Sequence, residues 1–221
     1  MKIGIVIPAH NEAMTIAKCL ASVQSAIKQL PSTIKVYPLV VLDSCTDDTQ
    51  SIVKAAGVDY LCCDYQCVGQ ARDIGIRHAI ANGAIWLTCT DADSVVTVDW
   101  LAQQIEHQPT DMICGVVEVD SWAHLTAQTR EDYIAHYQDK MGHHHIHGAN
   151  LSFSSEAYLA VGGFSSLPCH EDVDLVGKFE AQSYAITWSN RVRAMTSSRL
   201  QARADGGFAA FLNNLEQKNL H

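Results

Sequence analysis

The sequence IWLTCTDAD at residues 85–93 indicates which fold the chain adopts. A mostly apolar run that ends in two carboxylates is typical of a buried parallel strand with a ligand site at its tip. Because side chains alternate in extended chain, Asp91 and Asp93 are expected to point to the same side. Two carboxylates suit Mg²⁺ or Mn²⁺, which commonly also bind phosphate. The alternative is an exposed turn that caps the next helix, because Asp is frequent in both places.

The composition limits the class of protein. The chain has 221 residues, 48% of them hydrophobic, which is enough for one continuous core, so we predict a single domain over residues 1–221. The formal net charge of −9 argues against nucleic acid or an anionic membrane surface as a partner. The apolar run at residues 3–7 is too short for a signal peptide, and no later run reaches membrane-spanning length. These features predict a cytoplasmic protein without an integral membrane segment.

Strands and helices alternate along the first half of the chain. Buried strands are predicted at residues 2–7, 34–42, 58–62 and 84–89, with helices in the intervals between them. This alternation predicts an α/β fold in which a mostly parallel central sheet is flanked by helices. Because ligands of such sheets bind at the carboxyl ends of the strands, one edge should gather His10, Asn11, Asp43, Asp91 and Asp93.

The second half contains further helical and strand patterns. Helices are predicted at residues 97–106, 125–140 and 208–215, and strands at 112–119, 150–153 and 185–188. Residues 196–199 are expected to form a polar loop. No repeat or linker marks a second domain.

The sequence GHHHIHGAN at residues 142–150 is the most unusual local composition. In extended chain His143, His145 and His147 share one side, which suits a transition metal. The alternative, which we favour, is a polar loop that lines a substrate site.

The sequence HEDVD at residues 170–174 begins a helical pattern with acidic residues in its first turn. Such residues complement the helix dipole, which alone accounts for their presence. The functional interpretation is that one of these carboxylates acts as a general base.

Taken together, these segments resemble the family 2 glycosyltransferases, whose nucleotide-sugar-binding domain has the GT-A fold. The resemblance covers about residues 2–180, and the matching motifs occur in the order found in the family. They are IPAHNE (7–12), LDSCTDDT (42–49), DAD (91–93), GAN (148–150) with GGF (162–164), and ED (171–172).

The resemblance implies a metal-assisted site for a nucleoside-diphosphate sugar in residues 1–93, a Rossmann-like half. Asp91, Ala92 and Asp93 resemble the metal motif, with Asp93 as the more direct ligand of Mn²⁺ or Mg²⁺. Asp43 resembles the carboxylate that binds the base, and Arg72 is placed to balance phosphate charge. The nucleoside wall would be formed by Pro8, Ala9, His10 and Glu12.

The same resemblance implies an inverting hexosyltransferase-type reaction whose acceptor lies in residues 94–221. Asp172 would take the proton from the acceptor hydroxyl, and Glu171 is the competing base. The acceptor could be a small molecule, a glycan or a lipid-linked molecule. The residues expected to contact it are His147, Gly148, Asn150 and His170.

The sequence also departs from the family pattern. Leu42 stands where a second Asp often precedes Asp43. Many metal-dependent members have a further His ligand late in the chain, but here only His221 follows His170. Either the metal is held by fewer protein ligands and more water, or residues 196–199 replace the His, with Arg199 or Arg203 pairing with the diphosphate.

Two other functions are alternatives to glycosyl transfer. A nucleotidyltransferase that makes nucleotide sugars would need a glycine-rich, basic loop after the first strand, which residues 8–12 do not provide. A non-catalytic metal-binding protein on the same fold would have no need of both acidic motifs.

Overall fold

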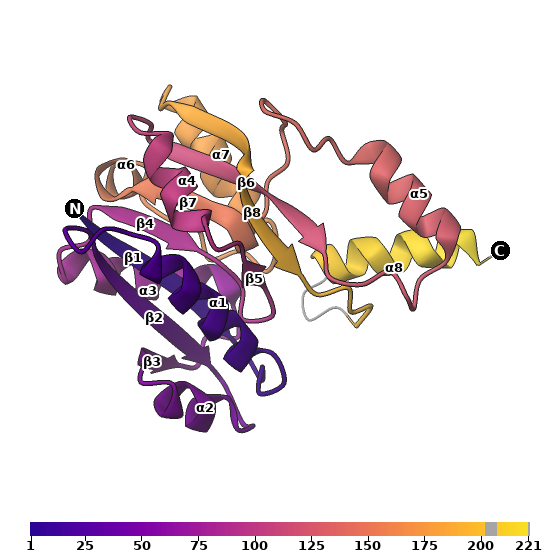
Figure 1. The fold of residues 1–221 in the computed structure, drawn as a ribbon, viewed down its shortest axis with the longest axis horizontal. Helices are drawn as coiled ribbons and strands as arrows, with labels where there is room; N and C mark the ends of the chain where they lie inside the picture. Colours follow the sequence, from indigo (N-terminus) through magenta and orange to yellow (C-terminus); the bar gives the residue numbers. More distant parts are fainter. Residues whose placement is uncertain (202–206, 221) are drawn as a thin grey trace.

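The computed structural model describes residues 1–201 and 207–220, which form one sheet with helices on both faces (Figure 1). The strands in this part of the chain are β1 (Lys2–Ala9), β2 (Lys35–Asp43), β3 (Asp59–Cys63), β4 (Trp86–Cys89), β5 (Val95–Val96), β6 (Met112–Val119), β7 (Leu151–Ser154) and β8 (Ile186–Thr196). The helices are α1 (Ile16–Lys28), α2 (Thr49–Ala55), α3 (Val68–Ala81), α4 (Trp100–Glu106), α5 (Ala127–His136), the 3₁₀ turn η1 (Gly148–Asn150), α6 (Ser155–Ala160), α7 (Glu171–Ala181) and α8 (Phe208–Asn219).

The sheet is mixed but mostly parallel. Its strand order is β3-β2-β1-β4-β7-β6-β8-β5. The pairs β1/β2, β2/β3, β1/β4 and β6/β8 are parallel, whereas β7 is antiparallel to both its neighbours and β5 is antiparallel to β8. One sheet thus contains strands from both halves of the chain, which confirms the predicted single α/β domain.

The two faces of the sheet carry separate hydrophobic cores. Ile3, Ile5 and Ile7 of β1 pack on one face with α1 and α4, while Val6 packs on the other with α3 and α7. This alternation is the period of two that a strand buried on both faces requires. At Gly75 an added Cβ would lie 2.6 Å from Val6 Cγ1, so glycine allows α3 to approach the sheet closely.

The register of the parallel strands brings their carboxyl ends to one edge. Ala9 at the end of β1 is opposite Leu42 of β2, and Val6 is opposite Cys89 of β4. The residues that follow each strand therefore lie near one another, as predicted for this class of sheet.

The strands β6 and β8 continue past the rest of the sheet toward α5 and α8, which pack on each other (Figure 1). Thr126, the N-cap of α5, donates its backbone N–H to Glu216 of α8 at 3.0 Å from Oε2. Asn219 of α8 also donates from Nδ2 to Thr129 Oγ1 at 3.1 Å. This helix pair forms an extension at the same end of the sheet as the carboxyl tips.

Several predicted elements differ in extent from those observed. The helix expected at residues 125–140 ends at His136, because Tyr137 is already in an extended conformation. The strand expected at residues 185–188 continues to Thr196 through a bulge, where β6 pairs Gly115 with Ser189 but Val116 with Arg193. The polar residues of this bulge obscure the strand in the sequence. The short elements β5 and α6 were not predicted.

Asn11 caps the turn after β2 rather than the helix α1 that follows it in the sequence. Its Oδ1 accepts the backbone N–H of Thr46 at 2.8 Å in the turn after β2, whereas α1 begins later, with Thr15 at its N-cap. Within residues 1–201 and 207–220, no helix has the length and apolar character needed to cross a membrane.

Candidate active site

The two carboxylates after β4 lie in a turn rather than in extended chain. Ser94 donates its backbone N–H to the carbonyl of Asp91 at 3.0 Å, which closes the turn before β5. The side chain of Asp91 is 35% exposed and faces Arg72, whereas that of Asp93 is 8% exposed and faces Arg199. The argument from strand alternation was therefore wrong for this pair, although both side chains line the same cleft.

Arg72 is a buried cation that joins three segments. Its Nη2 lies 2.6 Å from Asp91 Oδ1, and its Nη1 pairs with Glu171 at the start of α7. The guanidinium lies against Gly148, where an added Cβ would be 2.7 Å from Nη1. Burial alone would lower the pKa of Arg72, but the charges of Asp91 and Glu171 outweigh it and hold the pKa above its ordinary value. Arg72 is thus fully charged and internally paired.

Asp172 is held by backbone groups instead of by a cation. Its Oδ2 accepts the N–H of Gly148 at 2.7 Å, and its Oδ1 accepts the N–H of Val173 at 2.8 Å. The first turn of α7, which His170 enters with a φ of 62°, also favours a negative charge there. Glu171, in contrast, is buried against Arg72. Of the two predicted bases, Asp172 therefore has the carboxylate that is better placed to accept a proton from a substrate.

Asp43 holds the loop between β3 and α3. Its Oδ1 accepts the backbone N–H of Tyr65 at 2.8 Å and that of Gln66 at 3.0 Å, and its Oδ2 accepts that of Cys67 at 3.0 Å. Burial would raise the pKa of Asp43, but these hydrogen bonds, with one from Ser44, outweigh it and lower the pKa. The carboxylate thus fixes the position of Gln66 and Cys67, which line the cleft.

Replacing Asp43 with Asn is expected to lower the free energy of unfolding at pH 7 by about 1.5–3 kcal/mol, because an amide nitrogen cannot accept the N–H of Cys67. Since the folded-state pKa of Asp43 is lowered, its contribution is complete above the unfolded pKa of about 3.9 and is lost as the pH falls through the folded value. Urea unfolding of both proteins at pH 7 and at low pH should therefore show a difference that shrinks on acidification. Asp48→Asn, at an exposed N-cap whose side chain caps nothing, is the control.

The carboxylate oxygens near Asp93 suit a hard divalent cation that is held by only one or two protein side chains. Arg199 Nη2 lies 3.2 Å from Asp93 Oδ2, and its Nη1 lies 3.0 Å from Glu12 Oε1. In the described residues no group of three His, Cys, Asp or Glu side chains could enclose a metal. Mg²⁺ and Mn²⁺ often bind one or two carboxylates and complete their shell with water and phosphate. Asp93 and Asp91 fit this mode, in which the ion would share Asp93 with Arg199. Arg203 and His221 lie outside the described residues.

These groups line one cleft of about 1010 Å³ at the carboxyl edge of the sheet. The sequence-predicted residues found in its lining are Pro8, Ala9, His10, Glu12, Asp43, Arg72, Asp91, Ala92, Asp93, His147, Gly148, His170, Glu171 and Asp172. Residues far apart in the sequence are thus brought together as the fold class predicts.

A family model described as glycosyl transferase family 2 matches residues 4–158, which include the strand tips, Asp91, Asp93 and Gly148. This match covers more than half of the chain. The chain belongs to glycosyl transferase family 2. The family and the GT-A fold expected from the sequence are thereby confirmed. Among curated proteins, no significant sequence match is found.

Solved structures share this family 2 fold at low sequence identity. Residues 1–349 of TarS from S. aureus in complex with UDP-GlcNAc are 15% identical, with a TM-score of 0.70 over 95% of this chain and 61% of that one. The mannosyltransferase PcManGT from Pyrobaculum calidifontis in complex with GDP-Man and Mn²⁺ is 20% identical, with a TM-score of 0.67 over 87% of this chain and 56% of that one. The present chain therefore spans less than two thirds of either neighbour.

One residue predicted to contact the acceptor, Asn150, lies outside the cleft of this family 2 chain. Asn150 is fully buried and does not line the cleft. Its Nδ2 donates to the carbonyls of Val116 at 2.8 Å and Val192 at 2.9 Å, and its Oδ1 accepts from Trp100. These carbonyls border the bulge between β6 and β8. The assignment of Asn150 to the acceptor is therefore corrected: its amide satisfies backbone groups that the bulge leaves without strand partners.

The family 2 cleft also contains residues that the predicted site does not include. Gln66 and Cys67 enter it through the loop held by Asp43, and nothing in the sequence marked this loop. Phe208 and Phe211 line it from α8. Their spacing of three residues was a usable signal, because residues three apart share a helix face.

Proposed function

We propose that the chain transfers a sugar from a nucleoside-diphosphate sugar to an acceptor hydroxyl. The observation that carries this proposal is that Asp91, Asp93 and Asp172 line a single cleft. Membership of glycosyl transferase family 2 supports it, as does the presence of nucleotide sugars in the neighbouring TarS and PcManGT structures. In this proposal residues 1–93 bind the donor, and residues 94–221 bind the acceptor and supply the base.

Asp172 acts as the general base in the proposed mechanism. The N–H groups of Gly148 and Val173 orient its carboxylate, which accepts the proton as the acceptor oxygen attacks the anomeric carbon. Attack opposite the leaving nucleoside diphosphate is a single displacement and inverts the configuration at that carbon. Arg72 and Glu171 hold the cleft walls around the reacting groups.

Asp93 and Asp91 would hold Mn²⁺ or Mg²⁺ in this proposal. When bound, the ion would supply positive charge to the departing diphosphate. Arg199 supplies a second positive charge beside Asp93, and its guanidinium is suited to bidentate contact with phosphate oxygens.

Incubation of the protein with a panel of nucleotide sugars and acceptors, with Mn²⁺ present, tests the proposal. Release of nucleoside diphosphate is the expected result. Release of pyrophosphate from a nucleoside triphosphate and a sugar phosphate would instead indicate the nucleotidyltransferase. Tight zinc binding without either release would indicate the non-catalytic protein.

Donor binding is expected to depend on the divalent ion. A nucleotide sugar that binds only the folded state should raise the melting temperature in Mn²⁺ or Mg²⁺, and the rise should largely disappear after chelation. Asp93→Asn should lose this metal-dependent rise. Asp99→Asn, at the exposed N-cap of α4 and outside the cleft lining, should retain it. An equal rise with and without the ion would show that the chain binds its donor without metal.

A further inference from the structure

A wall of rings covers the part of the cleft contributed by α5, α8 and the segment before η1. This ring wall consists of Tyr133, Tyr137, His145, His147, Phe208 and Phe211, all of which line the cleft. Tyr137 stacks on His145 with ring centroids 4.1 Å apart and planes 4° apart, and on Tyr133 at 5.1 Å. Phe208 meets His147 edge-on at 6.3 Å. Phe211 is 48% exposed, so the wall has an open outer end.

The imidazole of His147 is neutral and lies beside the Tyr137 hydroxyl. The backbone N–H of Val117 donates to this hydroxyl at 2.8 Å, and the hydroxyl oxygen lies within hydrogen-bond distance of His147 Nε2, at 3.1 Å. Burial, together with His145 and His143, lowers the pKa of His147 to about 3. The neutral ring carries one N–H and one lone pair, so His147 is an uncharged hydrogen-bonding group in the cleft lining.

Two further histidines of this segment, His143 and His145, accept backbone hydrogen bonds that hold the wall. Nε2 of His145 accepts the backbone N–H of Gln138 at 2.8 Å, and Nδ1 of His143 accepts that of His145 at 3.1 Å. These lone pairs are the ones that a metal would need, so the geometry favours a substrate-lining role over a transition-metal site.

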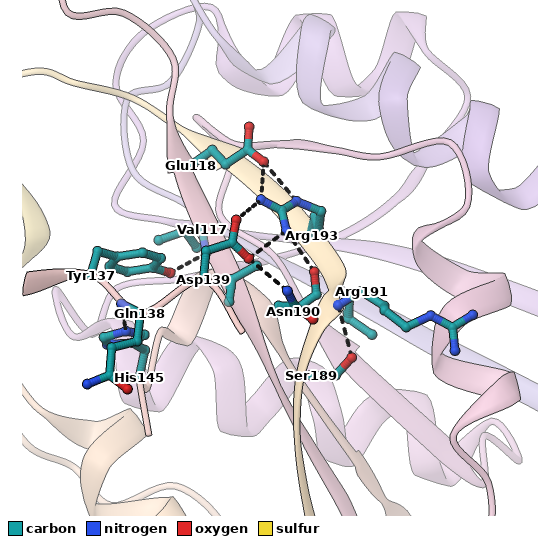
Figure 2. A network of polar contacts seen from close by, with 12 residues as sticks. Val117, Glu118, Tyr137, Gln138, Asp139, His145, Ser189, Asn190, Arg191 and Arg193 are labelled. Carbon is teal, nitrogen blue, oxygen red and sulfur yellow. Dashed lines mark hydrogen bonds and ion pairs between the residues drawn. The ribbon is translucent and has the colours of Figure 1, made fainter. Parts of the chain in front are cut away.

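An ion-pair network holds the segment after α5, which carries part of the ring wall, in place (Figure 2). Asp139 receives two bonds from Arg193 of β8, at 2.9 Å to Oδ1 and 2.7 Å to Oδ2. Arg193 also donates from Nε to Glu118 at 2.8 Å, and Asn190 donates to Asp139 at 3.0 Å. The network joins the segment after α5 to the sheet, so the wall is formed before a ligand arrives.

Beyond the diphosphate of the donor, the charge of the cleft disfavours a second anionic group at this wall. The described lining contains six carboxylates, Glu12, Asp43, Asp91, Asp93, Glu171 and Asp172, against two guanidinium groups, Arg72 and Arg199. Both guanidinium groups are paired with carboxylates. An additional phosphate on the acceptor would therefore meet no unpaired arginine in the described lining.

The wall is also adjacent to the proposed base. The peptide that follows His147 donates its N–H, on Gly148, to Asp172. A ligand that rests on the wall thus lies beside the carboxylate that would take its proton.

From these observations we infer that the acceptor is an uncharged, hydroxylated ring compound, a sugar or an aryl glycoside, that packs on the ring wall and is oriented by His147. This inference rests on the proposed function and narrows it: phosphorylated and diphosphate-linked acceptors are disfavoured. Aromatic rings suit the apolar face of a sugar ring or an aryl group, and the neutral imidazole of His147 suits a ring hydroxyl.

The test compares two acceptor series with the full chain and whichever donor the release assay selects. One series consists of p-nitrophenyl glycosides, and the other of the matching sugar 1-phosphates. Transfer to the uncharged series with at least about tenfold higher kcat/KM is expected, as is ligand-observed NMR binding of that series in the presence of the nucleoside diphosphate. Preference for the phosphates, or binding of neither series, overturns the inference.

Variants of the wall provide an independent readout. Phe211→Ala and His147→Ala should each raise the acceptor KM by about tenfold while calorimetric binding of the nucleoside diphosphate is retained. Ile134→Ala on α5, exposed and outside the cleft lining, is the control. An unchanged KM in both variants contradicts the ring wall as the acceptor site. Failure of the wild type to bind any nucleotide sugar or release any nucleoside diphosphate identifies failure of the proposed function itself.

Discussion

Asp172→Asn is expected to lower kcat by at least about 10²-fold while donor binding is retained, because an amide cannot accept the proton from the acceptor hydroxyl. The change is nearly isosteric, and the amide oxygen can still accept the N–H of Gly148, so the wall beside it should keep its shape. Initial rates of nucleoside diphosphate release and calorimetry of the nucleoside diphosphate measure the two effects separately.

Asp174→Asn is the matched control for this change. Asp174 also lies in the first turn of α7, but it pairs with Lys178 and is absent from the cleft lining. Its loss removes the same formal charge from the helix N-terminus without removing the proposed base. A kcat of Asp172→Asn close to that of Asp174→Asn would transfer the role of base to another group.

Arg72→Ala is expected to lower the free energy of unfolding by about 3–5 kcal/mol, because it leaves Glu171 buried without its cation. The side chain of Arg72 is 3% exposed and that of Glu171 is 7% exposed, so water cannot easily replace the pair. Urea unfolding at pH 7 provides the measurement. Loss of donor binding should accompany the loss of stability, since Asp91 also loses its partner.

Arg77→Ala on the same helix tests whether burial is the cause. Arg77 pairs with Asp73 four residues away, and their side chains are 48% and 25% exposed. Such a pair contributes at most about 0.5 kcal/mol. Adding Glu171→Gln to Arg72→Ala should recover part of the stability, because it removes the unpaired buried charge. Equal destabilisation by Arg72→Ala and Arg77→Ala would contradict this account.

The sequence was sufficient to predict the part of the cleft formed by residues 1–93, because the signals there are local. Apolar runs such as residues 2–7 can only be buried strands, and Asp43 and Asp91 directly follow such runs. Parallel pairing then brings the strand ends to one edge whatever the details of the loops. The family, the fold and most of the candidate site residues could be predicted in this way.

The part of the cleft formed by residues 94–221 was less predictable, because it depends on contacts between residues that are distant in the sequence. Because β8 contains a bulge, its sequence lacks the regular alternation of a strand. The bond from Asn150 to the Val192 carbonyl at this bulge becomes visible only in the folded sheet. Tyr137 leaves its helix because Arg193 and His145 hold the following residues.

The sequence by itself therefore determined the α/β fold, the family and the polar strand tips, starting from Asp91 and Asp93, because hydrophobic periodicity and strand ends are properties of neighbouring residues. The tertiary structure alone decided that Arg72 is sealed between Asp91 and Glu171, that Asp172 is oriented by Gly148, and that the rings form one wall. These features arise from side-chain packing and electrostatics across the sheet, which short segments of sequence do not encode.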